Sequence, residues 1–299
     1  SSKPLLASGG ADRAVRLWDV SARGGGEAAA VQTLAGHGGS VRALAQAGEA
    51  LLSGCTDGKV RCFRPGKARG NALYPWYEPT RVVVECSGWV NGLSFACTRK
   101  VGDLGALYVA DAAGALRSSV PRHGTGVAGR AADFPPWREA ECVVPEPPKD
   151  AALAAAAGPN AHPRGLSGVR FLADRRVLVA LAHDSKARVY DARTGGLLHV
   201  LDNPSGAPFT AVDWDAEHGQ LFLVDRHGYL LVYDLGTEEV VLARLCNPGE
   251  ELLGVQIVSG GRRVALTSSR GVQFLLVDRD IGYGALPGRH AGPVLAVLS

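Results

Sequence analysis

Short apolar runs separated by tight turns recur along most of the chain. Each run either alternates apolar and polar positions or is wholly apolar over about four to seven residues, and the turns between runs carry Gly, Asp or Ser. Clear pairs of runs span residues 6–19, 52–63, 180–191 and 222–234, and a weaker pair spans 264–278. This pattern predicts a series of antiparallel β-hairpins.

A further apolar run precedes each hairpin, and these runs are evenly spaced. Four of them begin at residues 166, 209, 252 and 293, which gives intervals of 43, 43 and 41 residues. That period matches one four-stranded propeller blade, and strands this regular with no helix between them exclude a doubly wound α/β sheet. We therefore predict an all-β chain in which residues 1–299 form a single closed β-propeller of four-stranded antiparallel blades. Six blades are recognisable, and a seventh, strongly diverged within residues 64–165, stays open.

Residue types at fixed places in the repeats resemble the WD-repeat β-propeller family. The family pattern is Gly-His before the first strand, Asp in a tight turn, and Trp-Asp at the end of the third strand. One repeat matches with Gly36-His37, Ser53 and Asp57, and has Phe63 in the place of Trp. In the family these residues form a hydrogen-bonded chain that holds a blade together, so the resemblance implies that role for His37, Ser53 and Asp57.

Another repeat is divided between the two ends of the chain. It supplies Ser8, Asp12 and Trp18 near the N-terminus, while its histidine is found in Arg289-His290. With the ends joined, His290 and Asp12 are 21 positions apart, close to the 20 positions between the corresponding residues of the intact repeat. The resemblance implies that the N- and C-termini share one blade, with residues 293–298 as its first strand, and that His290, Asp12, Ser8 and Trp18 pin it. Such closure covers sheet edges that would otherwise be exposed.

Three insertions interrupt the repeats, at residues 64–80, 119–139 and 145–165. The first two would each join a third strand to a fourth, and therefore emerge on the same face. Both carry aromatic residues beside Pro and Arg, which is typical of partner-binding loops. These aromatic residues are Tyr74, Trp76, Tyr77, Phe134 and Trp137. Two interpretations stay open: contact with a partner, or lids that fold back on their own blades. The third insertion is expected to be a solvated loop or a docking segment.

Charge and cysteine usage narrow the classes of partner and compartment. The 32 basic and 29 acidic residues leave a net charge of +3, too small to indicate nucleic acid or an anionic membrane surface. No apolar run approaches the roughly 18 residues that a membrane-spanning helix needs. The six Cys lack paired spacing and the N-terminus lacks a signal-peptide pattern. We therefore expect no membrane insertion and an intracellular location, either cytoplasmic or cytoskeleton-associated.

No catalytic residue, metal site or cofactor site is predicted. The eight His show no metal-ligand spacing, and no Ser lies in a nucleophile-elbow pattern. The glycines of 124–129 match a dinucleotide pattern, but Pro135-Pro136 prevents the helix that this pattern requires. Asp213, Asp215 and Glu217 lie near one predicted turn, where they either bind a cation or face water.

The family resemblance implies a non-enzymatic scaffold for protein–protein interaction. Its partners would be other proteins of a larger intracellular assembly, with cytoskeletal and ciliary complexes among the candidates. The alternative is a reader of a peptide motif or RNA within a ubiquitin ligase or a ribosome-assembly particle. The turns around Asp12, Asp57 and Asp184 would line the family's usual binding face, and the aromatic insertions would form a second patch on the opposite face.

Overall fold

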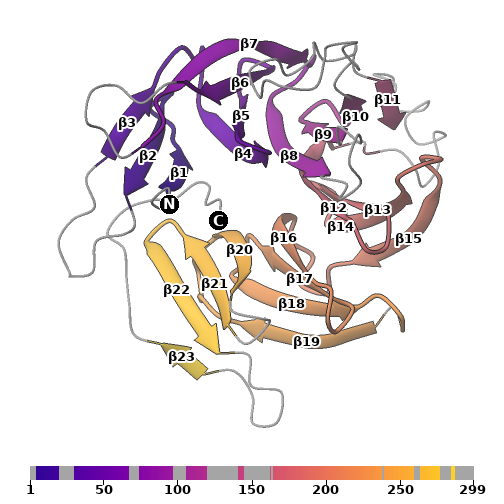
Figure 1. Cartoon of the computed structure of the whole chain (residues 1–299). Helices are drawn as coiled ribbons and strands as arrows, with labels where there is room; N and C mark the ends of the chain where they lie inside the picture. Colours follow the sequence, from indigo (N-terminus) through magenta and orange to yellow (C-terminus); the bar gives the residue numbers. More distant parts are fainter. Residues whose placement is uncertain are drawn as a thin grey trace.

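The computed structural model describes residues 5–19, 30–66, 74–96, 106–119, 141–144, 162, 164–237, 239–258, 263–276 and 284–286. The regular structure in these residues is β-strand, arranged in six antiparallel sheets around a common centre (Figure 1). The expected all-β propeller architecture is confirmed. No helix in the described part of the chain is long and apolar enough to cross a membrane.

The strands follow one another through the blades in chain order. Their bounds are β1 Leu5–Gly9, β2 Val15–Asp19, β3 Ala30–Leu34, β4 Val41–Ala47, β5 Ala50–Cys55, β6 Lys59–Pro65, β7 Tyr77–Glu85, β8 Val90–Ala96, β9 Ala106–Asp111, β10 Leu116–Ser119, β11 Glu141–Val144, β12 Leu166–Leu172, β13 Val177–Ala182, β14 Lys186–Asp191, β15 Leu197–Asp202, β16 Phe209–Asp215, β17 Gln220–Asp225, β18 Tyr229–Asp234, β19 Glu239–Leu245, β20 Leu252–Val258, β21 Arg263–Ser268, β22 Gly271–Leu276 and β23 Gly284–Leu286. Blade 1 consists of β1–β3, and blades 2 to 6 of β4–β7, β8–β11, β12–β15, β16–β19 and β20–β23.

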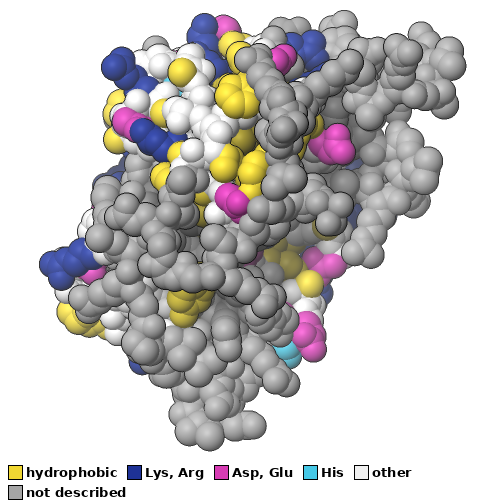
Figure 2. All heavy atoms as spheres, turned by 60° about the vertical axis from the view of Figure 1, so that its left-hand side comes forward, with side chains coloured by type: hydrophobic (Ala, Val, Ile, Leu, Met, Phe, Trp, Pro, Cys, Tyr) yellow, Lys and Arg dark blue, Asp and Glu magenta, His cyan; other side chains and the backbone are white. Residues whose placement is uncertain are grey.

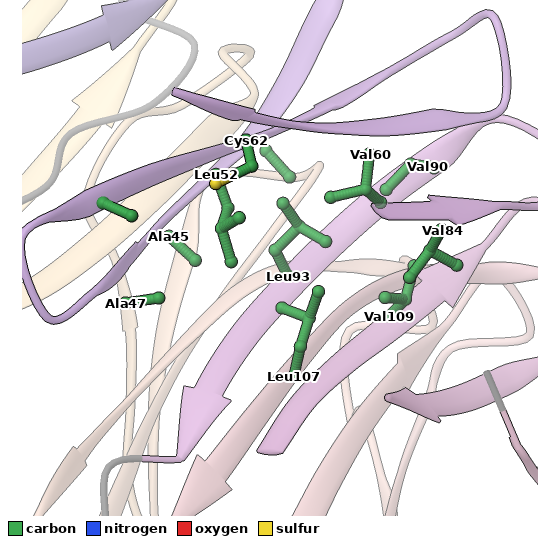
Figure 3. Packing of buried hydrophobic residues seen from close by; sticks show 12 residues of the cluster. Ala45, Ala47, Leu52, Val60, Cys62, Val84, Val90, Leu93, Leu107 and Val109 are labelled. Carbon is green, nitrogen blue, oxygen red and sulfur yellow. The ribbon is translucent and has the colours of Figure 1, made fainter. Parts of the chain in front are cut away.

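Within blades 2 to 6 the first strand lies nearest the centre and the fourth lies outermost (Figure 1). In blades 2 to 5 both faces are buried against the neighbouring blades, which explains why some middle strands are apolar throughout. All six residues of β5 and of β13 are buried. Alternate residues of one strand point to opposite sides, so Leu52 packs toward blade 3 while Leu51 packs toward blade 1. Figure 3 shows the first of these contacts, in which Leu52 and Val60 lie beside Leu93 and Leu107.

A β-bulge near the start of each inner strand turns one side chain toward the next blade. In β8, β12 and β16 the bulged residue is Asn91, Ser167 or Thr210. Each donates a hydrogen bond to the carbonyl of the first residue of the next inner strand, at 2.8, 2.7 and 2.6 Å. These bonds connect blades 3, 4, 5 and 6 in sequence around the centre.

The structure changes the boundaries of two predicted insertions. Outer strand β7 begins at Tyr77, so residues 77–80 belong to the sheet instead of to the insertion at 64–80. Likewise, Ser119 is the last residue of β10. Residues 120–140, which cover nearly all of the second insertion, lie outside the described residues.

Closure of the ring by the chain ends stays a prediction. His290 and residues 293–298 lie outside the described part of the chain. Blade 1 has three described strands, in the order β1–β2–β3, and among the described strands only β2 pairs with β1. The six described sheets correspond to the six repeats that the sequence pattern distinguishes.

Candidate functional site

One face of the propeller carries the turns between the second and third strands, together with the loops that enter the inner strands. We call it the turn face. Its turns lie at residues 10–14, 56–58, 112–115, 183–185, 226–228 and 269–270. Because successive strands are antiparallel, the turns between first and second strands and between third and fourth strands lie on the opposite face.

In blade 2 the structure brings His37 and Ser53 together, with His37 Nε2 2.7 Å from Ser53 Oγ. Asp57 accepts hydrogen bonds from the N–H of Gly38 at 2.9 Å and from Arg61 at 3.1 and 2.7 Å. The Asp57 carboxylate therefore binds the loop before β4 through the backbone N–H of Gly38, whereas the family pattern implies a bond to the imidazole of His37. Burial raises the pKa of Asp57, but Arg61 and the backbone N–H groups outweigh burial and hold that pKa well below its usual range.

In blade 1 the Trp18 indole Nε1–H donates to Ser8 Oγ at 2.8 Å. Asp12 accepts from the N–H of Ala14 at 3.3 Å and forms an ion pair with Arg16 at 2.5 Å. The structure thus brings Ser8 and Trp18 together, as the family pattern implies, and fixes the turn through Asp12. His290, the expected fourth member, lies outside the described residues.

Blade 4 contains a buried polar network that sequence analysis missed. Tyr190 Oη lies 2.9 Å from His162 Nε2, and Arg188 joins His162 Nδ1 at 3.5 Å to the Asp184 carboxylate at 3.2 and 2.6 Å. His162 is fully buried, and burial, reinforced by the Arg188 charge, lowers its pKa to about 4. The imidazole is therefore neutral at physiological pH.

His162 lies within the third predicted insertion, residues 145–165, for which the sequence predicts a solvated loop or a docking segment. The spacing in the sequence could have identified this histidine. His162 lies 22 positions before Asp184, close to the 20 positions between His37 and Asp57. Ala180 occupies the place of Ser53, since both are paired with the Arg of the next strand. Without a serine between them, the tyrosine hydroxyl reaches the histidine directly.

Other blades fix their turns with different residues. In blade 5, Asn203 Nδ2 and Ser205 Oγ donate to the buried Asp225 at 2.9 and 2.5 Å. In blade 6, Glu250 accepts from Ser268 Oγ at 3.0 Å and from Asn247 Nδ2 at 3.1 Å. In both cases hydrogen bonds join the loop before the inner strand to the end of the second strand of the blade, so they tie this loop to the adjoining turn.

The turns are also tied to the inner strands by a repeated backbone hydrogen bond. The N–H of the first turn residue donates to the carbonyl of the residue that precedes the inner strand of the same blade. The donor–acceptor pairs are Thr56–Ser40 at 3.0 Å, Ala112–Trp89 at 2.8 Å, His183–Gly165 at 3.1 Å and Arg226–Pro208 at 3.3 Å. The donors therefore occupy equivalent positions around the inner margin of the turn face.

The aromatic residues of the first insertion contact the molecule itself. The Tyr74 hydroxyl donates to Asp19 of blade 1, and Gln32 of blade 1 exchanges hydrogen bonds of 2.6 and 2.9 Å with the Tyr77 backbone. The Trp76 carbonyl accepts from the Gly66 N–H at 2.7 Å. Tyr74, Trp76 and Tyr77 are half-buried, which favours the lid interpretation for this loop. Partner binding by these residues stays a prediction, and Phe134 and Trp137 lie outside the described residues.

The acidic residues near the β16–β17 turn are engaged within the molecule. Asp213 forms an ion pair with Arg170 at 2.8 Å and accepts from the Ile257 N–H at 2.7 Å. Asp215 lies 2.8 Å from His218 Nδ1 and accepts from the Glu217 N–H at 3.1 Å. No group of three or more His, Cys, Asp or Glu is placed to hold a metal ion within the described residues.

Charges of both signs are interspersed on the surface. In Figure 2, where the left-hand side of Figure 1 comes forward, described Lys and Arg side chains alternate with Asp and Glu, and hydrophobic side chains show between them. This distribution creates no large field of a single sign on the described part of this view.

Comparison with known proteins agrees with this geometry. Residues 1–19 and 29–64 match the family model described as WD domain, G-beta repeat. The fold is similar to the crystal structure of the WD40 β-propeller domain of Doa1, with a TM-score of 0.64 and 13% sequence identity over 92% of this chain and 75% of that one. No curated protein sequence matches the chain significantly. The circular arrangement of the sheets, with turns held by side-chain hydrogen bonds, defines a β-propeller. The repeat pattern then specifies the type: the two N-terminal repeats match the WD40 family model, and the fold of the chain is that of a WD40-type β-propeller.

Proposed function

We propose that the chain is a non-enzymatic scaffold that binds other proteins through its turn face. The observation that carries this proposal is the set of buried polar networks, which fix the turns in successive blades. A rigid loop loses little conformational entropy when a partner binds, so more of the contact energy is retained as affinity. WD40 domains generally bind proteins and are generally not catalytic, which supports the same conclusion.

The assembly that contains the chain belongs to this proposal as well. A cytoskeletal or ciliary complex in an intracellular setting is consistent with the small net charge and the unpaired spacing of the six Cys. The alternative is a reader of a peptide motif or RNA, as in a ubiquitin ligase or a ribosome-assembly particle. An exposed Trp89 on the turn face supports the peptide form of this alternative.

Affinity capture from extracts of the source cells, read by mass spectrometry, tests the proposal. The whole chain should retrieve a reproducible set of proteins that withstands nuclease treatment. An empty capture, or one that nuclease abolishes, would contradict the scaffold function and favour the enzyme or RNA-reader interpretation.

A variant with Trp76→Ala and Trp137→Ala tests the aromatic insertions in the same experiment. Loss of partners by a cooperatively folded variant would place the interface at the insertions, on the face opposite the turns. Retention of partners, which we expect, would support binding through the turn face.

A further inference from the structure

The outer strand of blade 5 exposes large apolar side chains to solvent. β19 runs along the outside of the blade and is the last strand of its sheet, so its outer edge pairs with no other described strand (Figure 1). Three of its seven residues are large, apolar and exposed: Val240 at 38%, Val241 at 54% and Leu245 at 43%. No other described strand contributes more than two such residues. Apolar exposure is therefore concentrated at this edge.

The outer strands of the other blades are shorter or interrupted. β3, β11 and β23 have only three to five residues, and β15 has six. The nine residues of β7 include Pro79, whose nitrogen cannot donate a hydrogen bond. β19 is thus the longest described outer strand that contains no proline. Short strands and proline are among the devices that keep a sheet edge from pairing with another chain, and β19 has neither.

The backbone of β19 directs hydrogen-bonding groups away from its own sheet. The N–H of Cys246, which directly follows β19, donates to the Gly228 carbonyl at 2.9 Å. In an antiparallel ladder, residues that bond to the neighbouring strand alternate with residues whose backbone groups face the other way. Ala243 and Leu245 therefore direct their N–H and carbonyl groups outward, where a further strand can bind them.

A β-bulge places Glu239 and Arg244 on the same side of the sheet, although they are five positions apart. The bulge adds Val241 to β19. Glu239 lies opposite Asp234 of β18, and Arg244 lies opposite Leu230. Asp234 and Leu230 are four positions apart in a strand without an extra residue, so their side chains point the same way, and so do those of the residues opposite them. One side of β19 thus carries an acid near its start and a base near its end.

Two copies of β19 match each other in antiparallel orientation. A register that sets Glu239 of one copy opposite Arg244 of the other also sets Val240 opposite Ala243. Val240 and Ala243 share the other side of the sheet. Each pair therefore joins side chains that point the same way, as paired strands require, and unlike charges meet at both ends of the contact.

We propose that β19 pairs with β19 of a second copy of this chain, which extends the sheet of blade 5 across a two-fold axis. Both copies use the same strand, so the two edges cover each other and association stops at the dimer. Main-chain hydrogen bonds and the side chains of Val240, Val241 and Leu245 stabilise the contact, and the Glu239–Arg244 pairs fix its register. The contact lies on the rim and leaves the turn face free, so the inference is independent of the proposed scaffold function.

Analytical ultracentrifugation of the whole chain between about 1 and 100 µM, a range suited to a small interface, tests the proposal. The measured mass should rise from 31.1 kDa toward twice that value. Val241→Lys should weaken dimerisation at least about tenfold, because lysine on an edge strand opposes pairing. The matched control is Val200→Lys on the outer strand β15, where Val200 is 37% exposed. This variant should dimerise as the parent does.

Charge reversal tests the antiparallel register. Glu239→Arg and Arg244→Glu each place like charges opposite each other twice in the dimer, so each variant alone should dimerise about tenfold more weakly than the parent. An equimolar mixture of the two variants should dimerise again, because every pair then joins unlike charges. Damage by either substitution to its own blade would not be relieved by mixing. Thermal melts check that all variants unfold as cooperatively as the parent.

Four results would overturn the inference. These are a mass of 31.1 kDa over the whole concentration range, dimerisation that Val241→Lys leaves unchanged, an equal loss in Val200→Lys, and charge variants that stay monomeric after mixing. A monomeric chain that captures proteins from cell extract, and loses them in Val241→Lys, would show that β19 pairs with a strand of another protein instead. Failure of dimerisation alone leaves the scaffold function of the turn face standing.

Discussion

At the residue scale, the blades are held by polar side chains that folding has removed from water. His162 is the clearest case, because its two ring nitrogens face Tyr190 and Arg188 inside a fully buried site. A neutral imidazole can be satisfied there by hydrogen bonds, whereas a protonated one would place a second positive charge beside the Arg188 guanidinium. The stability of blade 4 is therefore linked to pH.

We expect acid to destabilise the protein through His162. The pKa of His162 is about 4 in the native state against 6.5 ordinarily, so between these values the unfolded chain binds a proton that the native chain does not. Stability is then highest above pH 6.5 and falls as the pH drops through this window, by about 2 kcal/mol at pH 5. Urea unfolding at pH 7.5 and pH 5 measures this change.

A His162→Gln variant should have a lower free energy of unfolding than the parent at pH 7.5. Between pH 7.5 and pH 5 its free energy of unfolding should fall by about 2 kcal/mol less than that of the parent, because the titrating group is gone. His227→Gln, which alters an exposed turn histidine, is the control and should keep the pH dependence of the parent. An identical pH dependence in His162→Gln and the parent chain would refute the linkage.

At the element scale, the inner strands are the connection between blades. The bulged residues join neighbouring inner strands one by one, but Asp213 of β16 joins three strands at once. It pairs with Arg170 of β12 at 2.8 Å and accepts from the Ile257 N–H of β20 at 2.7 Å. Its side chain is buried while that of Arg170 is half exposed, so the backbone hydrogen bond should matter more than the ion pair.

Substitution at Asp213 separates these two contributions. Asp213→Ala leaves the Ile257 N–H without its acceptor and should lower the free energy of unfolding by about 2 kcal/mol. Asp213→Asn keeps an acceptor oxygen and removes only the charge, so it should cost less than about 1 kcal/mol. Urea denaturation measures the free energy of unfolding of both variants, and unchanged m-values would show that the two unfold as the parent does. Equal losses in the two variants would mean that the ion pair, and not the backbone contact, connects the strands.

At the scale of the whole molecule, the six described sheets surround one centre, and consecutive blades from blade 1 to blade 6 pack their apolar faces against each other. A ring of this kind is stable when every sheet is complete, because an unpaired inner strand exposes both backbone groups and apolar surface. The pairing of residues 293–298 with β1 would complete blade 1.

Deletion of residues 287–299 tests this closure. Loss of an inner strand should lower the unfolding temperature by roughly 10 °C and promote aggregation. Deletion of residues 146–158, an equally long part of the predicted solvated insertion, is the control and should change the unfolding temperature little. Differential scanning calorimetry and light scattering provide the readings; equal unfolding temperatures for the 287–299 deletion and the parent would contradict closure by this segment.

The residue pattern by itself determined the class of fold. Side chains along a strand alternate between two faces, so strands leave a period of two in the apolar positions, and tight turns require particular residues. The repeat of about 43 residues, the turn residues Asp12 and Asp57 and the pairs Trp18–Ser8 and His37–Ser53 are local signals that survive without an alignment. Each of these signals depends on the number of residues between two positions, and that number can be counted in the sequence.

Only the tertiary structure decided which residues meet across blades and which stay exposed. His162 lies in a segment that the sequence predicts to be a solvated loop or a docking segment, yet it closes the network of blade 4. A bulge turns Thr210 of β16 toward the next inner strand, whereas at the equivalent bulge of β4 the Arg42 side chain is exposed. Many contacts between blades join residues about 40 or more positions apart, as Asp213 and Ile257 do. No local spacing rule specifies such contacts, because the packing of whole sheets sets their geometry.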